Sequence, residues 1–125
     1  MLKDSSLMAF VGVIDLDRAR TFYGDVLGLE IVSTDQFAIQ ARASGTSLRI
    51  TKVPTVTAAA YTVLGFVVSG IETKIDALSA RGVTFERYGF LGEAQNAKGI
   101  WTSPSGAQVA WFKDPDGNLL SLSEH

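Results

Sequence analysis

The stretch DLDRARTFYGDVLGL, residues 15–29, decides the fold that this sequence is expected to adopt. Its aspartates can accept hydrogen bonds from free backbone amides, so Asp15 or Asp17 can cap the start of a helix. Gly28 stands where a helix would end with a left-handed residue. Between these points, apolar residues recur at helical spacing, at Ala19, Phe22, Tyr23, Val26 and Leu27. The stretch therefore predicts an amphipathic helix with a defined start and end.

Strands are predicted on both sides of this helix. Residues 7–14 (LMAFVGVI) are apolar throughout, which predicts a buried strand before it. Three strand candidates follow the helix, at residues 29–33, 37–42 and 47–53. The order strand, helix and three strands describes one βαβββ module, which spans about residues 7–53.

The same plan returns in the second half of the chain. Residues 61–68 predict an apolar strand, and residues 71–82 predict a short helix that ends at a glycine. Strand candidates follow at residues 83–88, 99–102, 108–112 and 119–123. The second module therefore spans about residues 61–123, and a linker, residues 54–60, separates it from the first.

Alternation along the predicted strands gives each sheet one apolar side and one mixed side. In the first strand, Val11 and Val13 share one side, while Met8 and Phe10 share the other. We expect the apolar side to pack on the helices and the mixed side to line a cleft.

The length, charge and residue composition of the chain exclude several classes of function. A length of 125 residues suits one compact domain, residues 1–125. A net charge of −2, without a basic cluster, gives no reason to expect nucleic acid as a partner. The absence of cysteine excludes disulfides, thiolate metal sites and a cysteine nucleophile. Asp4 stands where a signal peptide would need an apolar run, and no apolar run reaches the length of a membrane span, so we expect a cytoplasmic protein that does not bind membranes.

Two motifs in the chain resemble those of a known superfamily. Residues 15–29 look like the opening of the vicinal oxygen chelate superfamily, and FKDPDGNL, residues 112–119, resembles its closing motif. That superfamily contains glyoxalase I, extradiol dioxygenases, fosfomycin-resistance proteins and bleomycin-resistance proteins. The resemblance covers essentially the whole chain. It implies an α+β fold of two tandem βαβββ modules that form a curved sheet with a cup-shaped cleft, commonly assembled as a homodimer.

The resemblance also indicates where a metal would be held. Metal-dependent members usually place a histidine, a carboxylate or another ligand in the first and last strands of each module. The equivalent residues here are Met8, Arg49 (or Thr51, if the register slips), Val63 and Ser121. A catalytic divalent ion needs about three nitrogen, oxygen or anionic ligands, which this set cannot supply. We therefore expect no metal and no other cofactor.

The mixed sides of the sheets carry the candidate ligand-binding residues. Arg49 is either an exposed arginine or a cleft residue that receives an anionic group of a ligand. Trp101 and Trp111 lie in a polar, glycine-rich part of the chain, and at least one is expected to stack on a ligand. The candidate set is Met8, Phe10, Phe37, Arg49, Thr51, Val63, Trp101, Trp111 and Ser121.

Two features near the end of the chain, an acidic stretch and a histidine, are not expected to form a metal site or a catalytic site. The stretch DPDGN, residues 114–118, predicts a tight turn, because its residue types favour turns and its spacing does not match an EF-hand. His125 is the only histidine and is expected to be exposed. A single histidine in this position leaves no ordinary nucleophile triad, so no catalytic residue is assigned.

The polar loop over residues 92–99 is either a lid or a plain connection.

Three functions remain open on the sequence alone. The favoured one is a metal-independent binding protein, similar to bleomycin-resistance proteins, that sequesters an aromatic or hydrophobic molecule such as an antibiotic in a cleft of a homodimer. The second is an enzyme: a metal-dependent lyase or dioxygenase with ligands elsewhere, or a metal-free isomerase or lyase with Glu30 or Glu86 as its base. The third is a structural or regulatory dimer without a ligand.

Overall fold

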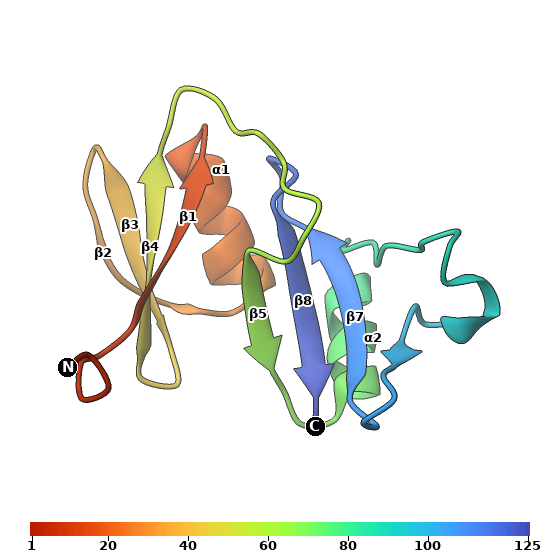
Figure 1. Cartoon of the computed structure of the whole chain (residues 1–125). Helices are drawn as coiled ribbons and strands as arrows, with labels where there is room; N and C mark the ends of the chain where they lie inside the picture. Colours follow the sequence, from red (N-terminus) through yellow and green to blue (C-terminus); the bar gives the residue numbers. More distant parts are fainter. The chain divides into compact units, whose positions relative to one another are not determined.

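The computed structural model describes all residues, 1–125, and divides into two compact units, Met1–Thr57 and Ala58–His125 (Figure 1). Each unit holds one four-stranded sheet. The division falls inside the predicted linker, residues 54–60. The two predicted modules are therefore separate sheets, each complete within its own unit.

The sheet of the first unit has the strand order β1-β4-β3-β2. Its strands are β1 (Met8–Val13), β2 (Glu30–Thr34), β3 (Ala38–Ala43) and β4 (Thr46–Lys52). β1 and β4 run parallel, whereas β3 runs antiparallel to both β4 and β2. The first and last strands of the module thus lie side by side, as the predicted βαβββ order requires.

The helix predicted from the opening stretch is confirmed, but its winding changes midway. α1 (Leu16–Arg20) begins at Asp15, whose Oδ1 accepts a hydrogen bond from the backbone N of Arg18 at 3.1 Å. The chain continues as the π-helical segment η1 (Thr21–Val26), and Gly28 follows with a φ of 76°. A π-helical turn is wider than an α-helical one, and hydrophobic spacing alone could not distinguish the two.

The second unit repeats this plan with the strand order β5-β8-β7-β6. Its elements are β5 (Leu64–Val67), α2 (Ile71–Ala80), the 3-10 turn η2 (Gly92–Ala94), β6 (Trp101–Thr102), β7 (Gln108–Lys113) and β8 (Leu119–Glu124). β5 runs parallel to β8, while β7 runs antiparallel to β8 and β6. α2 lies behind β7 and β8 in Figure 1 and covers one face of this sheet. None of the helices is both long and apolar enough to cross a membrane.

The strand predicted over residues 83–88 is wrong. Phe85 makes only an isolated bridge to Phe112, and the backbone N of Glu86 donates to the carbonyl of Trp111 at 2.7 Å. The segment thus touches the edge of β7 at one point and forms no ladder.

A side-chain amide binds the backbone of this segment beyond its bridge to β7. Oε1 of the buried Gln95 accepts a hydrogen bond from the backbone N of Tyr88 at 2.7 Å. Its Nε2 donates to the carbonyl oxygens of Glu86 at 3.1 Å and Gly99 at 2.9 Å. Gln95 therefore satisfies a backbone donor and a backbone acceptor of the segment that no strand pairs.

The predicted apolar and mixed sides of the first sheet are confirmed. Val11, Val13 and Ile50 are buried, whereas Met8 and Phe10 are 46% and 60% exposed. Covering one face of the sheet with α1 leaves the other face open. Large apolar side chains on that open face must then contact a ligand, another chain or water.

The predicted turn over residues 114–118 is confirmed, and it is built around a buried carboxylate. Oδ1 of Asp114 accepts hydrogen bonds from the backbone N of Asp116 and of Asn118, each at 2.9 Å. Its Oδ2 accepts a third from Nδ2 of Asn118 at 2.8 Å. Gly117 takes a φ of 88°, which favours glycine. These acidic residues therefore hold the entry to β8.

Replacing Asp114 should destabilise the protein. Asp114→Ala would leave three donors without their acceptor, which should lower the free energy of unfolding by about 1–3 kcal/mol. Urea denaturation followed by circular dichroism measures this loss. Asp4→Ala, at an exposed aspartate, serves as the matched control and should change little. Equal losses in the two variants would contradict the assignment.

Glu124 closes the second module by capping its helix. Its Oε2 accepts a hydrogen bond from the backbone N of Gly70 at 2.9 Å, and its Oε1 accepts one from that of Ile71 at 3.0 Å. These bonds lower the pKa of Glu124 below the ordinary value of 4.5. The carboxylate at the end of β8 thus satisfies free amides at the start of α2.

The contribution of Glu124 to stability should depend on pH. Because the pKa of Glu124 is lower in the folded state, the stabilisation is fully present above the ordinary value of 4.5 and is lost as the pH falls through the folded pKa. Unfolding of the wild type and of Glu124→Gln should therefore differ by a constant amount at neutral pH and converge in acid. Glu93→Gln, at an exposed glutamate, is the control. A difference that grows in acid would disprove this linkage.

Candidate ligand-binding site

The second unit contains a pocket of about 340 Å³ that is lined mainly by aromatic side chains. Five of its nine lining residues are aromatic, and none carries a charge. We call it the aromatic pocket. Its lining residues are Ala60, Tyr61, Thr62, Tyr88, Phe90, Leu91, Trp101, Trp111 and Leu119.

The sheet places both tryptophans on one wall of this pocket. Trp101 of β6 pairs with Val109 of β7, and Trp111 lies two residues further along β7. Side chains two residues apart on a strand share a face, so the two indole rings become neighbours. Their ring centroids are 6.2 Å apart, and the ring planes are tilted by 34°.

A second wall comes from the irregular segment that follows α2. The ring of Tyr88 meets that of Trp111 edge to face, with centroids 5.5 Å apart and planes at 78°. The ring of Phe90 lies 5.5 Å from that of Tyr88. Phe90 is 85% exposed and Tyr61 is 71% exposed, although both line the pocket. Ring surface on this side of the unit is therefore free to contact a ligand.

Hydrogen bonds to the loop over residues 92–99 hold the second wall in place. Besides the bonds of the Gln95 amide, the guanidinium of Arg87 donates to the carbonyl of Asn96 at 2.8 Å and to that of Gln95 at 3.2 Å. The backbone on both sides of Arg87 is thus fixed to this loop, and Tyr88 follows directly. The loop acts as a brace for the aromatic wall.

The titratable groups near the pocket do not form an acid–base pair. Burial raises the pKa of Tyr88, and the nearby carboxylate of Glu86 raises it further, so the phenol keeps its proton. Glu86 itself forms an ion pair with Lys113 at 3.5 Å. Glu30, the other base considered from the sequence, is paired with Arg42 at 3.2 Å. Both glutamates are therefore engaged with cations.

The first unit brings several candidate residues together on its open face. Phe10 of β1 and Gln40 of β3 flank Arg49 of β4 in the strand register. Thr51 lies two residues beyond Arg49 on the same strand, while Met8 lies opposite Ser47 and not opposite Arg49. The half-buried Arg49 is thus placed between an aromatic ring and an amide.

Phe37 precedes β3 in a turn that is organised by Asp35. Oδ1 of Asp35 accepts hydrogen bonds from the backbone N of Phe37 at 2.7 Å and of Ala38 at 2.9 Å. These bonds lower the pKa of Asp35, and the charge of Arg49 lowers it further. The ring of Phe37 is largely exposed.

Ser121 and Val63 lie next to the aromatic pocket but do not line it. Ser121 of β8 pairs with Trp111 on one side and with Gly65 on the other. A Cβ at Gly65 would lie 3.1 Å from Oγ of Ser121, so the glycine leaves room for the hydroxyl. Val63 follows the lining residue Thr62 and donates its backbone N to the carbonyl of Leu119.

The residues at the positions expected to hold a metal do not fit a divalent ion. They offer the thioether of Met8, the guanidinium of Arg49, the isopropyl group of Val63 and the hydroxyl of Ser121. Nowhere in the structure do three or more histidine, aspartate or glutamate side chains gather as they would around a metal ion.

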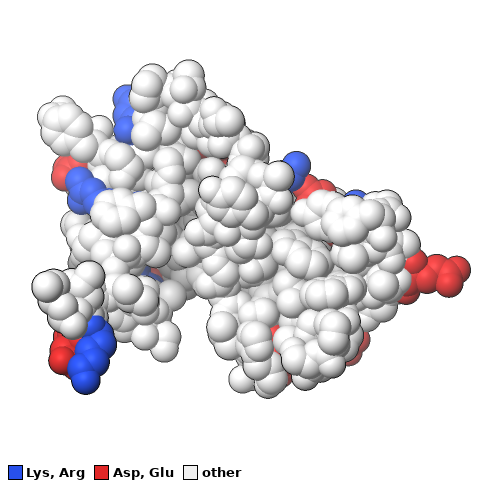
Figure 2. Space-filling model, in the orientation of Figure 1, with Lys and Arg blue, Asp and Glu red and all other residues white.

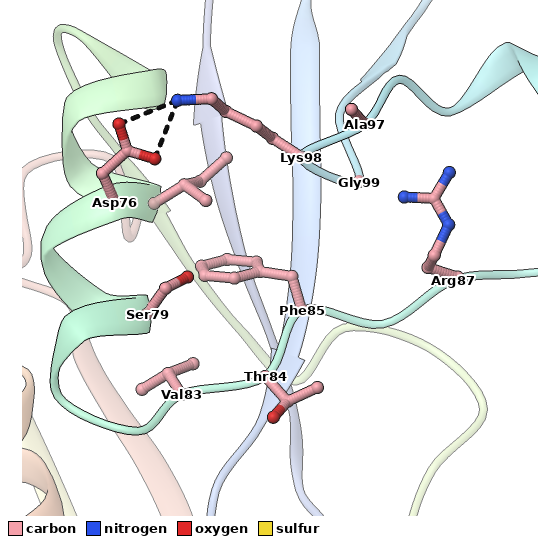
Figure 3. A pocket seen from close by; sticks show the side chains of 10 residues that line it. Asp76, Ser79, Val83, Thr84, Phe85, Arg87, Ala97, Lys98 and Gly99 are labelled. Carbon is pink, nitrogen blue, oxygen red and sulfur yellow. Dashed lines mark hydrogen bonds and ion pairs between the residues drawn. The ribbon is translucent and has the colours of Figure 1, made fainter.

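A second pocket, of about 390 Å³, lies on the helix side of the second unit (Figure 3). At one end Nζ of Lys98 contacts both carboxylate oxygens of Asp76, at 2.7 and 2.8 Å, and Phe85 points toward α2. This bond raises the pKa of Lys98. The pocket is lined by Ile75, Asp76, Ser79, Val83, Thr84, Phe85, Arg87, Ala97, Lys98 and Gly99. Its lysine and aspartate are paired with each other, which ties the bracing loop to α2.

The candidate binding residues are divided between the two units. Trp101 and Trp111 line the aromatic pocket, whereas Met8, Phe10, Phe37, Arg49 and Thr51 belong to the other unit. Tyr88, Phe90 and Gln95 were not among the predicted candidates. The i, i+2 spacing of Tyr88 and Phe90 is a signal that could have grouped the two rings on one side of the segment.

Comparison with known proteins identifies one family. Residues 7–122 match the model of the Glyoxalase/Bleomycin resistance protein/Dioxygenase superfamily. No match to this chain was found among curated proteins.

Solved structures with the same fold include three that match nearly the whole chain. A member of this superfamily from Sphaerobacter thermophilus is 24% identical, with 100% of both chains covered and a TM-score of 0.76. A lactoylglutathione lyase from Agrobacterium tumefaciens is 18% identical, covering 99% of this chain and 96% of its own, also with a TM-score of 0.76. A glyoxalase family protein from Enterococcus faecalis is 20% identical, with coverages of 99% and 100% and a TM-score of 0.72. At these identities the likeness shows the fold alone.

Removing the amide of Gln95 should loosen the aromatic wall. Gln95→Met keeps the length of the side chain but removes the bonds that Gln95 makes to the N of Tyr88 and to the carbonyls of Glu86 and Gly99. We expect a loss of about 1–3 kcal/mol in the free energy of unfolding and weaker near-ultraviolet circular dichroism of the aromatic residues. Gln36→Met, at an exposed glutamine, is the control. Unchanged spectra and stability in Gln95→Met would contradict the bracing role.

Proposed function

The chain belongs to the Glyoxalase/Bleomycin resistance protein/Dioxygenase superfamily, and within it we propose that it is a metal-independent binding protein. Its ligand is a flat aromatic or hydrophobic small molecule, such as an antibiotic, which it sequesters in the aromatic pocket. This function resembles that of bleomycin-resistance proteins.

One observation carries the proposal: five aromatic side chains and no charged side chain line a pocket of about 340 Å³. Small-molecule sites are typically concave and apolar, with a few polar groups that set orientation. Here the hydroxyls of Thr62, Tyr61 and Tyr88 are such groups. Each aromatic contact with a ligand ring contributes about 0.5–1.5 kcal/mol beyond the area that it buries.

The metal-dependent activities of the superfamily are less well supported. The four positions that would hold the ion carry Met8, Arg49, Val63 and Ser121, which is a poor donor set for any divalent cation. A lactoylglutathione lyase shares the fold at 18% identity, and that likeness carries no activity to this chain. Binding a ligand without catalysing a reaction requires only the aromatic pocket.

We also propose that the protein works as a cytoplasmic homodimer. Met8 and Phe10 on the first sheet, and Val67 at the end of β5, are exposed apolar side chains. Such side chains on sheet faces suit an interface or a shared cleft. In such a dimer, Phe37, Arg49 and Thr51 of the first unit, and Val63 and Ser121 of the second, are proposed to contribute to ligand binding.

Ligand titration with fluorescence detection tests the proposed function. Both tryptophans of the chain line the aromatic pocket, so tryptophan fluorescence, excited selectively over that of tyrosine, reports on this site. A panel of aromatic natural products, including glycopeptide antibiotics, should contain molecules that shift or quench this emission and raise the melting temperature. The dissociation constants should be unchanged after treatment with EDTA.

Variants of the pocket separate specific from nonspecific binding. Trp101→Leu should weaken binding about 10-fold, which corresponds to about 1.4 kcal/mol, and calorimetry can follow it without the lost fluorophore. Val32→Ala, at an exposed apolar residue of β2, is the control. Absence of any binding across the panel would sink the proposal. Near-stoichiometric nickel, zinc, manganese or iron in protein purified without chelator would favour the metal-dependent lyase or dioxygenase instead.

A further inference from the structure

Resting on that proposed function, we propose that the aromatic pocket selects an organic cation whose charge is spread over a weakly hydrated group. Quaternary ammonium groups and N-alkylated aromatic rings belong to this class. The inference concerns the charge of the ligand, which the proposed function leaves open.

The lining of the pocket favours a cation over an anion. The faces of aromatic rings carry negative potential, and a cation within about 6 Å of a ring centroid is attracted to it. Tryptophan is the strongest of these partners, and the pocket holds both tryptophans of the chain. An anion would meet no lysine, arginine or histidine among the lining residues, so nothing would offset its loss of hydration.

The orientation of the rings suits a compact cationic group. The planes of Tyr88 and Trp111 meet at 78°, while those of Trp101 and Trp111 differ by only 34°. Walls set nearly at right angles form a corner, in which one positive group can contact more than one ring. A single flat stacking surface would not provide this.

The charges beside the pocket do not favour an anion. Burial raises the pKa of Tyr88, and the nearby carboxylate of Glu86 raises it further. Lys113 pairs with Glu86 at 3.5 Å, but its side chain is 53% exposed and hence well screened by solvent. In Figure 2, the side of the second unit that carries β5, β8 and β7 shows almost no lysine or arginine, and acidic side chains project from its right-hand edge.

The cost of removing such a cation from water is small in this pocket. Quaternary ammonium and N-alkylpyridinium groups have no N–H donors that would need a partner after binding. The exposed rings of Tyr61 and Phe90 leave one side of the pocket open, so the ligand keeps part of its hydration. Its volume of about 340 Å³ lies at the small end for ligand pockets, which suits a head group attached to one or two rings.

Three probes of matched shape test the charge preference: the 1-methylquinolinium cation, neutral 1-methylnaphthalene and the 1-naphthoate anion. All have a two-ring aromatic core with one small substituent, and they differ chiefly in charge. Calorimetric titration of the full chain at low ionic strength should show the cation binding about 3-fold or more tightly than the neutral probe. The anion should bind most weakly.

Replacing both tryptophans with fluorinated tryptophan tests whether the cation preference arises from the electrostatic potential of the rings or from their shape. Fluorination withdraws electron density from the indole face and changes its size little. Because both tryptophans line the pocket, biosynthetic replacement alters only this site. The ratio of cation to neutral affinity should fall toward one, while the affinity for the neutral probe should change little. Val32→Ala in the unlabelled protein should leave the ratio unchanged.

The outcomes distinguish this inference from the proposed function. Equal or tighter binding of the neutral probe or of naphthoate overturns the cation preference and leaves the binding function standing. A ratio that does not respond to fluorination also overturns it. If none of the three probes binds, and the wider panel of natural products does not bind either, both proposals fall.

Discussion

The parallel pairing of the first and last strands in each module constrains the rest of the structure. β1 pairs with β4, and β5 pairs with β8, each in parallel. A parallel connection cannot be made by a tight turn, so the chain must cross one face of the sheet, and it does so as a helix. That helix buries one face and leaves the other free. The open faces that carry the candidate binding residues are therefore a consequence of strand order.

The second unit modifies this plan through a single buried amide. Gln95 bonds to the backbone of Glu86 and of Tyr88, beyond the single bridge that the segment makes to β7. The chain turns directly after Tyr88, where the backbone N of Leu91 donates to the carbonyl of Tyr88 at 3.0 Å. Phe90 lies in this turn, and its ring lines the pocket together with that of Tyr88. The second aromatic wall therefore comes from an irregular segment and not from a strand.

The sequence predicted what local chemistry determines. The capped start of the first helix at Asp15 or Asp17, the order of strands and helix along the chain and the turn at Asp114 can each be read from neighbouring residues, and all three are confirmed, with Asp15 as the cap. The closeness of the Trp101 and Trp111 rings follows from alternation once the antiparallel pairing of β6 with β7 is known. The role of Gln95 could not be foreseen, because a polar residue in a polar loop gives no sign that its amide will be buried. The segment over residues 83–88 has strand-like composition, and only the tertiary contact overrides it.

The same pocket that suits binding is poorly equipped for chemistry. Its titratable groups are the hydroxyls of Tyr61 and Tyr88, and burial raises the pKa of Tyr88, so this phenol holds its proton at neutral pH. General acid–base catalysis needs a group whose pKa lies near the working pH. Catalysis also requires contacts that are stronger in the transition state than in the ground state. Ring faces attract a bound molecule equally at every stage of a reaction unless its charge changes there. A pocket built from such faces therefore fits the proposed binding function better than a catalytic one.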